Sequence, residues 1–153
     1  MVNAWRISKT RYAAAAFDGE GARLNGGRWN SVGIRVAYAS ESLALATLEV
    51  LVGLQDTAAL SSYSLTRAEF PENLVEVLDR HALPATWHQH PPSPETQSVG
   101  DLWVAQARSA VLKVPSAVVD AEHNYLLNPS HPAFAKVLVH APEPFQLDPR
   151  LLR

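Results

Sequence analysis

The chain of 153 residues contains no cysteine. It therefore has no disulfide scaffold, no thiolate zinc site, no iron–sulfur cluster and no cysteine nucleophile. Charge is also scarce, because charged residues make up 18% of the chain, with 13 Lys+Arg against 15 Asp+Glu. Since nucleic acids and anionic membranes are bound through clustered basic residues, this balance argues against both as direct partners.

Targeting signals and long apolar runs are missing as well. The N-terminal stretch MVNAWRISKTRY lacks the apolar core and the cleavage site of a signal peptide. The longest apolar run, residues 43–54, is interrupted by Glu49 and Gly53 and is too short to span a bilayer. With 47% apolar residues, the chain is expected to form one soluble, cytoplasmic domain over residues 1–153 with a sizeable core.

What is present predicts many short strands and few helices. A helix is expected after the Ser40-Glu41-Ser42 segment, where a hydroxyl can cap it and Gly53 can end it, and a second over residues 96–109. The glycine-rich segment 18–33, the proline-rich segment 81–95 and the segment NYLLNPSHPAF are expected to be loops or turns. Strands are expected at residues 4–8, 34–39, 60–68, 74–79, 110–114, 116–120, 135–140 and 144–148. The pattern indicates an α+β fold with mainly antiparallel strands, in one sheet or in two packed sheets.

The sequence does not contain the common motifs of nucleotide-binding sites and of serine hydrolases. Gly19-Glu20-Gly21 begins a dinucleotide-binding fingerprint, but Leu24 stands where a glycine is needed, and neither a P-loop nor a G-x-S-x-G elbow occurs. His81, His88 and His90 lie near one another without an acidic or thiolate partner at ligand spacing. Loop histidines are therefore favoured over a zinc site, and no metal is expected.

Two charged residues in unusual settings are the first candidates for a site. Glu49 is the one charge between Glu41 and Asp56, and it lies within an apolar helix. It is either a site carboxylate or a helix-edge residue that reaches solvent. Arg28 follows two glycines that let the backbone approach a ligand, so it either binds a phosphate or carboxylate or faces solvent beside a core Trp29.

Three further residues have a functional and a structural interpretation. Tyr38 either stacks on a planar ligand or belongs to the core, and Arg6 is either a phosphate clamp or an edge charge. Ser116, after Pro115, is by itself a turn residue. Asn124, together with the following Asn-Pro segment, is interpreted as part of a turn and not as a ligand contact.

These segments together resemble the RES domain family, which is named after an Arg, a Glu and a Ser. The matching residues are Arg28 in GGRWN, Glu49 in LALATLEVLV and Ser116 in VPSAVV. The flanking segments WRI, GEGARLNGGRWNSVG, VAYAS and NYLLNPSHPAF match too, so the resemblance covers about residues 4–148.

The resemblance implies a fold similar to the ADP-ribosyltransferase toxins and a chemistry centred on NAD as substrate, with no prosthetic group. It implies that Arg28, Glu49 and Ser116 are catalytic: Glu49 stabilises an oxocarbenium-like ribose cation and Arg28 holds the diphosphate. Ser116 binds the substrate or orients Glu49 or Arg28. The predicted NAD-binding residues are Arg6, Tyr38, Trp29 and Asn30.

The resemblance also implies a biological role. Members of the family are toxins of bacterial toxin–antitoxin pairs that degrade NAD by phosphorolysis or hydrolysis, or that transfer its ADP-ribose to a protein target. The expected partner is an Xre-type helix-turn-helix antitoxin, which carries any DNA contact, and a homodimer of this chain is expected within that complex. A hypothesis from another class is an inactive homologue that binds a partner or a nucleotide without chemistry.

Overall fold

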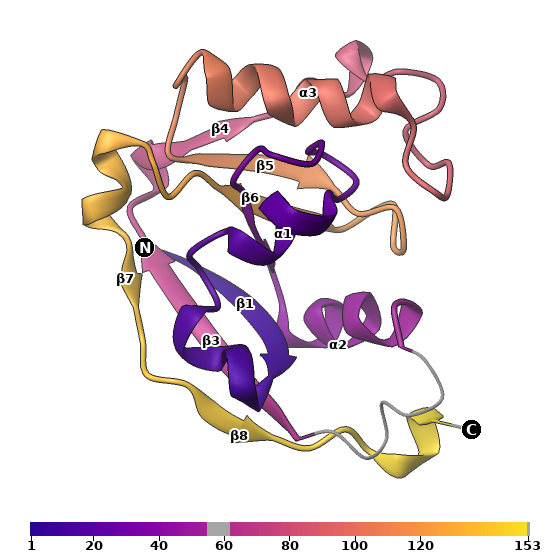
Figure 1. Ribbon diagram of the computed structural model, residues 1–153, viewed down its shortest axis with the longest axis vertical. Helices are drawn as coiled ribbons and strands as arrows, with labels where there is room; N and C mark the ends of the chain where they lie inside the picture. Colours follow the sequence, from indigo (N-terminus) through magenta and orange to yellow (C-terminus); the bar gives the residue numbers. More distant parts are fainter. Residues whose placement is uncertain (55–61, 153) are drawn as a thin grey trace.

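The computed structural model describes residues 1–54 and 62–152. Within this part of the chain, eight strands form one curled sheet in the order β4-β5-β6-β2-β1-β3-β7, and β8 also pairs with β3 (Figure 1). The strands are β1 (Val2–Lys9), β2 (Ala37–Ser40), β3 (Tyr63–Phe70), β4 (Val75–Val77), β5 (Val111–Pro115), β6 (His123–Leu127), β7 (Leu138–Val139) and β8 (Glu143–Phe145). All pairs are antiparallel except β4 with β5.

The sheet has two halves that meet at a narrow joint. β1 and β3 pair along their full length, from Val2 opposite Phe70 to Lys9 opposite Tyr63. In contrast, β1 pairs with β2 only where Trp5 lies opposite Ser40. The prediction of two packed sheets is therefore wrong, because this joint makes one curled sheet out of the two strand groups.

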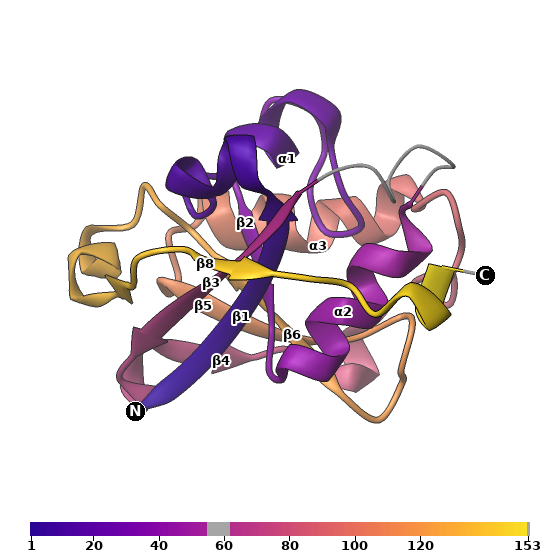
Figure 2. The same cartoon turned by 90° about the horizontal axis from the view of Figure 1, so that it is seen from below.

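Three α-helices accompany the sheet: α1 (Glu20–Asn25), α2 (Leu43–Val52) and α3 (Pro94–Ala105). α2 was predicted correctly, since the Ser42 hydroxyl accepts a hydrogen bond from the amide of Leu45 and Gly53 follows its last turn. It packs beside β1 (Figure 2), whereas α3 spans the β4-β5-β6 half (Figure 1). Five 3₁₀ turns complete the elements of the described residues: Thr10–Ala15, Glu72–Leu74, Arg80–Ala82, Pro132–Lys136 and Pro149–Leu152.

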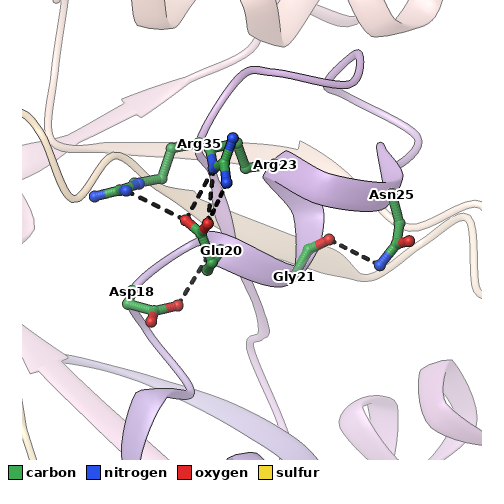
Figure 3. Close-up of polar contacts among 6 residues, drawn as sticks. All are labelled: Asp18, Glu20, Gly21, Arg23, Asn25 and Arg35. Atoms are coloured by element: carbon green, nitrogen blue, oxygen red, sulfur yellow. Dashed lines mark hydrogen bonds and ion pairs between the residues drawn. The ribbon is translucent and has the colours of Figure 1, made fainter.

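α1 lies within the glycine-rich segment that was expected to be a loop. Its first residue, Glu20, pairs with Arg23 one turn on and with Arg35 on a later segment, at 3.2 Å (Figure 3). The Asp18 carboxylate also accepts a hydrogen bond from the amide of Glu20, at 2.9 Å. The prediction of an unbroken loop over residues 18–33 is therefore wrong.

The predictions from the sequence were wrong for the segment from Ser116 to Leu127. Residues 116–120 were expected to be a strand, but the Ser116 hydroxyl accepts hydrogen bonds from the amides of Val118 and Val119, which turns the chain. The NYLL segment was expected to be a turn, but it is part of β6, a central strand between β2 and β5. The remaining strand predictions are met within a few residues, apart from residues 60 and 61 of the third, which lie outside the described residues.

Apolar side chains fill three clusters that follow the two halves of the sheet. One lies around Phe70, Tyr125 and Leu127, and one lies between α3 and the β5-β6 strands around Trp29, Trp103 and Leu126. A third, around Ile7 and Ala46, holds α2 against β1. The space between the second and third clusters is where the cavity described next opens.

Candidate active site

A cavity of about 590 Å³ opens where β1, β2, α2, α1 and the loop after α1 meet. This volume lies within the ordinary range of small-molecule sites. Five of the seven predicted site residues line it: Arg6, Arg28, Trp29, Tyr38 and Glu49. Residues of the Ser116 turn and the first residues of β6 close the far side, through Ala117, Val118 and Asn124.

Glu49 extends from the second turn of α2 into the cavity. Its Oε1 atom accepts hydrogen bonds from the Ser116 hydroxyl at 2.8 Å and from the Asn124 amide at 2.7 Å. Its Oε2 atom makes no hydrogen bond to any described residue. The carboxylate is therefore held in one orientation by Oε1, while Oε2 is left for a ligand.

Ser116 lies behind Glu49 and does not line the cavity. It is fully buried, and its hydroxyl oxygen already accepts from the amides of Val118 and Val119. Since both lone pairs are occupied, its single proton points to Glu49. Of the roles that the resemblance left open, the geometry supports orientation of Glu49.

Arg28 enters the cavity from the loop after α1. Its Nη1 atom donates to the backbone carbonyls of Trp87, at 2.9 Å, and Gln89, at 2.8 Å. Burial lowers the pKa of Arg28, while the charge of nearby Glu49 acts in the opposite direction. The guanidinium remains charged, and its Nη2 and Nε atoms make no hydrogen bond to the described residues.

Arg6 reaches the same cavity from β1. Its Nη1 atom donates to the backbone carbonyl of Tyr38 at 2.9 Å, and its buried Nε atom has no hydrogen-bond partner. Burial lowers the pKa of Arg6, and no described carboxylate lies at ion-pair distance. Asp18 attracts this half-buried guanidinium from beyond ion-pair distance, and the guanidinium is suited to bind an anionic ligand in the cavity.

Tyr38 and Asn30 hold the loop that carries Arg28. The Tyr38 hydroxyl donates to the Asn30 side-chain oxygen at 2.5 Å and accepts from the amide of Trp29 at 3.1 Å. Burial raises the pKa of Tyr38, so its proton is retained. Gly27 passes so close to this pair that a Cβ atom there would lie 2.6 Å from the Tyr38 hydroxyl. The glycine before Arg28 is therefore required by close packing.

The other two predicted NAD-binding residues differ in their surroundings. Trp29 is 2% exposed and stacks on Trp87 with ring centroids 6.2 Å apart, so it is mainly a core residue. Asn30 is fully buried and does not line the cavity. Its amide donates to three backbone carbonyls, those of Ala22, Ser31 and Ile34. The structure therefore supports a role for Asn30 in shaping the loop and not in contacting a ligand.

Asn124 and Ser40 belong to the site although the sequence did not single them out as site residues. Ser40 donates from its hydroxyl to the Asn124 side-chain oxygen at 2.7 Å, which turns the Asn124 amide toward Glu49. The two residues are opposite one another on β2 and β6. No local signal marks this contact, because it depends on the pairing of strands more than 80 residues apart.

The histidines were interpreted as loop residues, and no described group of three His, Asp or Glu side chains has the arrangement of a metal site. His90 lines the cavity, whereas His88 lies beside Asp120. In addition, none of the helices in the described part of the chain has the length and apolar character to cross a membrane.

The site therefore combines one oriented carboxylate with two guanidinium groups around a cavity large enough for a nucleotide. Cationic groups of this kind bind phosphates, and a fixed carboxylate stabilises positive charge that develops on a bound sugar. These features define a mixed α/β domain whose cavity brings two guanidinium groups and one oriented carboxylate together.

Comparisons with known proteins agree on one family. The RES domain family matches residues 3–148, and the chain therefore belongs to that family. It is 37% identical over 150 residues to "Toxin Res" of Photorhabdus laumondii, covering 97% of this chain and 96% of that protein. It is 36% identical over 154 residues to the "Prs ADP-ribosylating toxin" of a Sphingobium strain, covering 97% and 96%.

A solved structure shares the fold. The chain matches one in the M. tuberculosis MbcT–MbcA toxin–antitoxin complex with a TM-score of 0.78 and 18% identity, covering 99% of this chain and 86% of the other. The mixed α/β architecture with a curled sheet and few helices is thus found in a second protein of known structure.

Proposed function

We propose that this chain is the toxin of a bacterial toxin–antitoxin pair and that it consumes NAD by cleaving the nicotinamide–ribose bond. The observation that carries the proposal is the convergence of Glu49, Arg28 and Arg6 on one cavity. The names of its relatives, which include "Toxin Res" and an ADP-ribosylating toxin, support the same class of activity.

Each residue has a defined task in this reaction. The bond between C1′ of the ribose and the nicotinamide nitrogen breaks, and the electron pair leaves with nicotinamide. Positive charge develops on the ribose ring, where the free Oε2 atom of Glu49 stabilises it. Arg28 and Arg6 neutralise the diphosphate, and Tyr38 lies where a planar ring can pack. Water or phosphate then attacks C1′ and loses a proton to solvent.

Transfer of ADP-ribose to a protein side chain is the second candidate activity. It is favoured by the relative whose name describes an ADP-ribosylating toxin. The same groups would bind NAD and stabilise the ribose cation, and only the acceptor would differ. The two activities are separated by following the fate of the ADP-ribose.

An antitoxin is the proposed partner. The chain shares its fold with a protein solved as part of a toxin–antitoxin complex. That the antitoxin is of the Xre helix-turn-helix type and that a homodimer forms within the complex are predictions from the family resemblance. A cytoplasmic location of the chain is a prediction from its composition and sequence pattern alone.

The deciding experiment is nicotinamide release from NAD by the purified chain and by Glu49→Gln. Gln preserves the oxygen that accepts from Ser116 and Asn124 but removes the negative charge. Release is expected to fall by about 10²- to 10³-fold, the usual effect of removing one group that stabilises transition-state charge. Thermal unfolding should change little.

The control is Glu76→Gln, since Glu76 lies on β4 and pairs with Arg108 away from the cavity. Reactions with water alone, with phosphate and with a cell lysate identify the acceptor. Labelling of a lysate protein would support the transferase. NAD that stays intact under all three conditions would refute both activities and favour a binding module.

A further inference from the structure

A cluster of exposed polar side chains connects the segment that supports Arg28 with the turn that supports Glu49. The Asp120 carboxylate accepts from Arg80 Nη2 at 2.7 Å and lies 3.4 Å from His88 Nε2. The Arg80 Nη1 atom also donates to the backbone carbonyl of Asp120, at 3.2 Å. We call these three residues the Asp120 clasp. None of them lines the cavity, and the proposed reaction does not use them.

One side of the clasp is the segment that supports Arg28. His88 lies between Trp87 and Gln89, whose carbonyls accept both hydrogen bonds from Arg28 Nη1. The segment is stiffened by Trp87, which packs on the His88 ring at 3.6 Å between centroids and lies under the Arg80 guanidinium at 5.7 Å. A displacement of His88 therefore moves the two carbonyls that hold Arg28.

The other side of the clasp is the turn that supports Glu49. Asp120 follows Ser116 by four residues. The Ser116 hydroxyl accepts hydrogen bonds from the amides of Val118 and Val119, which lie between them, and it donates to Glu49. Both segments project from the same side of the molecule, above α2 in Figure 1. A displacement of Asp120 therefore moves the donor that orients Glu49.

We propose that Asp120 is a positioning residue: by binding Arg80 and His88 it sets the separation between Arg28 and Glu49 across the cavity. The contacts form a continuous path from Arg28 through residues 87–89, Asp120 and Ser116 to Glu49. The inference rests on the proposed cleavage of NAD. It adds a role for residues that the family resemblance does not include.

The alternative is that these contacts are ordinary surface ion pairs, which contribute little to stability. Two features distinguish the clasp. The Asp120 carboxylate contacts two residues of one segment, Arg80 and His88. It thereby connects the segment that supports Arg28 with the turn that supports Glu49. Because a misplacement of about 1 Å can reduce a rate by about 10²-fold, a weak contact in this position affects catalysis more than folding.

The test compares wild type with Asp120→Ala, Arg80→Ala, the double variant and the charge-swapped pair Asp120→Arg with Arg80→Asp. Each alanine variant is expected to lower kcat for nicotinamide release by about threefold to tenfold, in keeping with weak exposed pairs. KM and the thermal midpoint should change little. The double variant should be no worse than Asp120→Ala, and the swapped pair should recover part of the kcat.

The matched control is a second exposed pair between distant residues, Arg108 and Glu76, whose nitrogen and oxygen lie 3.0 Å apart and outside the cavity. Arg108→Ala and Glu76→Ala should leave kcat unchanged. A kcat for Asp120→Ala equal to that of wild type or of the controls overturns the inference. Additive losses in the double variant without recovery in the swapped pair overturn it as well.

A second measurement separates this inference from the proposed function. Hydrogen exchange of the Val118 and Val119 amides reports on the Ser116 turn without any substrate. Asp120→Ala should accelerate it and Glu76→Ala should not. Faster exchange in a chain that does not cleave NAD rejects the proposed function alone, whereas unchanged exchange rejects the clasp.

Discussion

Ser116 is a buried residue whose hydroxyl donates to Glu49. It lies outside the cavity, and its oxygen is saturated by two amides. Its proton is therefore committed to Glu49. A serine nucleophile needs an open path to the substrate, and Ser116 lacks one because it does not line the cavity.

Replacement of this residue by alanine tests that interpretation. Ser116→Ala should lower kcat for NAD cleavage by about tenfold to hundredfold with little change in KM, because Glu49 loses a donor that orients it. The variant should also lose about 1–3 kcal/mol of stability, since two amides are left without an acceptor. Steady-state kinetics and urea unfolding measure the two effects.

Ser98→Ala is the matched control, because the Ser98 hydroxyl is exposed on α3 and donates to its own helix. It should leave kcat and stability close to wild type. A rise in KM for Ser116→Ala with an unchanged kcat would show instead that the hydroxyl contacts the substrate.

At the scale of elements, α3 is the support for the loop that carries Arg28. Gln97 donates from its side chain to the Gly27 carbonyl at 3.0 Å, and Asp101 accepts from the Ser31 amide at 2.9 Å. These residues lie one helical turn apart, on the same face as Gly100. At Gly100 the helix backbone approaches the Trp29 carbonyl so closely that an added Cβ would lie 1.8 Å from its oxygen.

Gly100→Ala should therefore push α3 away from the Arg28 loop. We expect a loss of about 1–3 kcal/mol in the free energy of unfolding, as for other overpacked contacts, together with a lower rate of NAD cleavage. Urea unfolding and nicotinamide release are the measurements.

Gly21→Ala is the comparison, because a Cβ at this position of α1 meets no atom within 4 Å. Alanine favours a helix, so this variant should be stabilised by about 0.5–1 kcal/mol. Equal stability of the two variants would contradict the close approach of α3 to Trp29.

At the scale of the whole molecule, the cavity is a product of the joint in the sheet. Its walls come from residues as distant in the chain as Trp5 and Asn124, and the two strand groups meet beside it where Trp5 is opposite Ser40. A ligand that fills the cavity therefore contacts both halves. Such a ligand stabilises the native state by binding it in preference to the unfolded chain.

NAD should raise the unfolding temperature of Glu49→Gln, which binds the dinucleotide without consuming it. At a hundred times the dissociation constant, the gain is about 2.7 kcal/mol. Adding Arg6→Gln should greatly reduce the shift, since Arg6 is a half-buried cation in the cavity wall and makes no ion pair with a described residue. Differential scanning fluorimetry over a range of NAD concentrations measures both, and equal shifts would remove Arg6 from the ligand site.

The sequence predicted the elements whose signals are local. α2 was predicted from its serine cap, its apolar composition and Gly53, and β1 was predicted from the segment that follows the N-terminus. The turn after Ser116 and β6 were missed because a side-chain hydroxyl and a central position in the sheet overrode the local pattern. α1 was missed because the glycines within and beside it were interpreted as signs of a loop.

The sequence likewise predicted some residues of the candidate site and missed others. Arg28 and Glu49 were found because a lone charge in an apolar helix and an arginine after paired glycines are unusual in themselves. Asn124 was not found, since an asparagine near a proline is ordinary in sequence. Its role depends on the register that sets it opposite Ser40 on β2.

By itself the sequence determined the family and the helix that carries Glu49, and it predicted Arg28, Glu49 and Ser116 as the site residues. These are properties of composition and of neighbours along the chain. Only the tertiary structure decided that Ser116 orients Glu49, that Asn30 shapes a loop and that Asp120 joins the two supporting segments. The reason is physical: hydrogen bonds and ion pairs depend on distances of about 3 Å between side chains, and the strand pairing sets those distances.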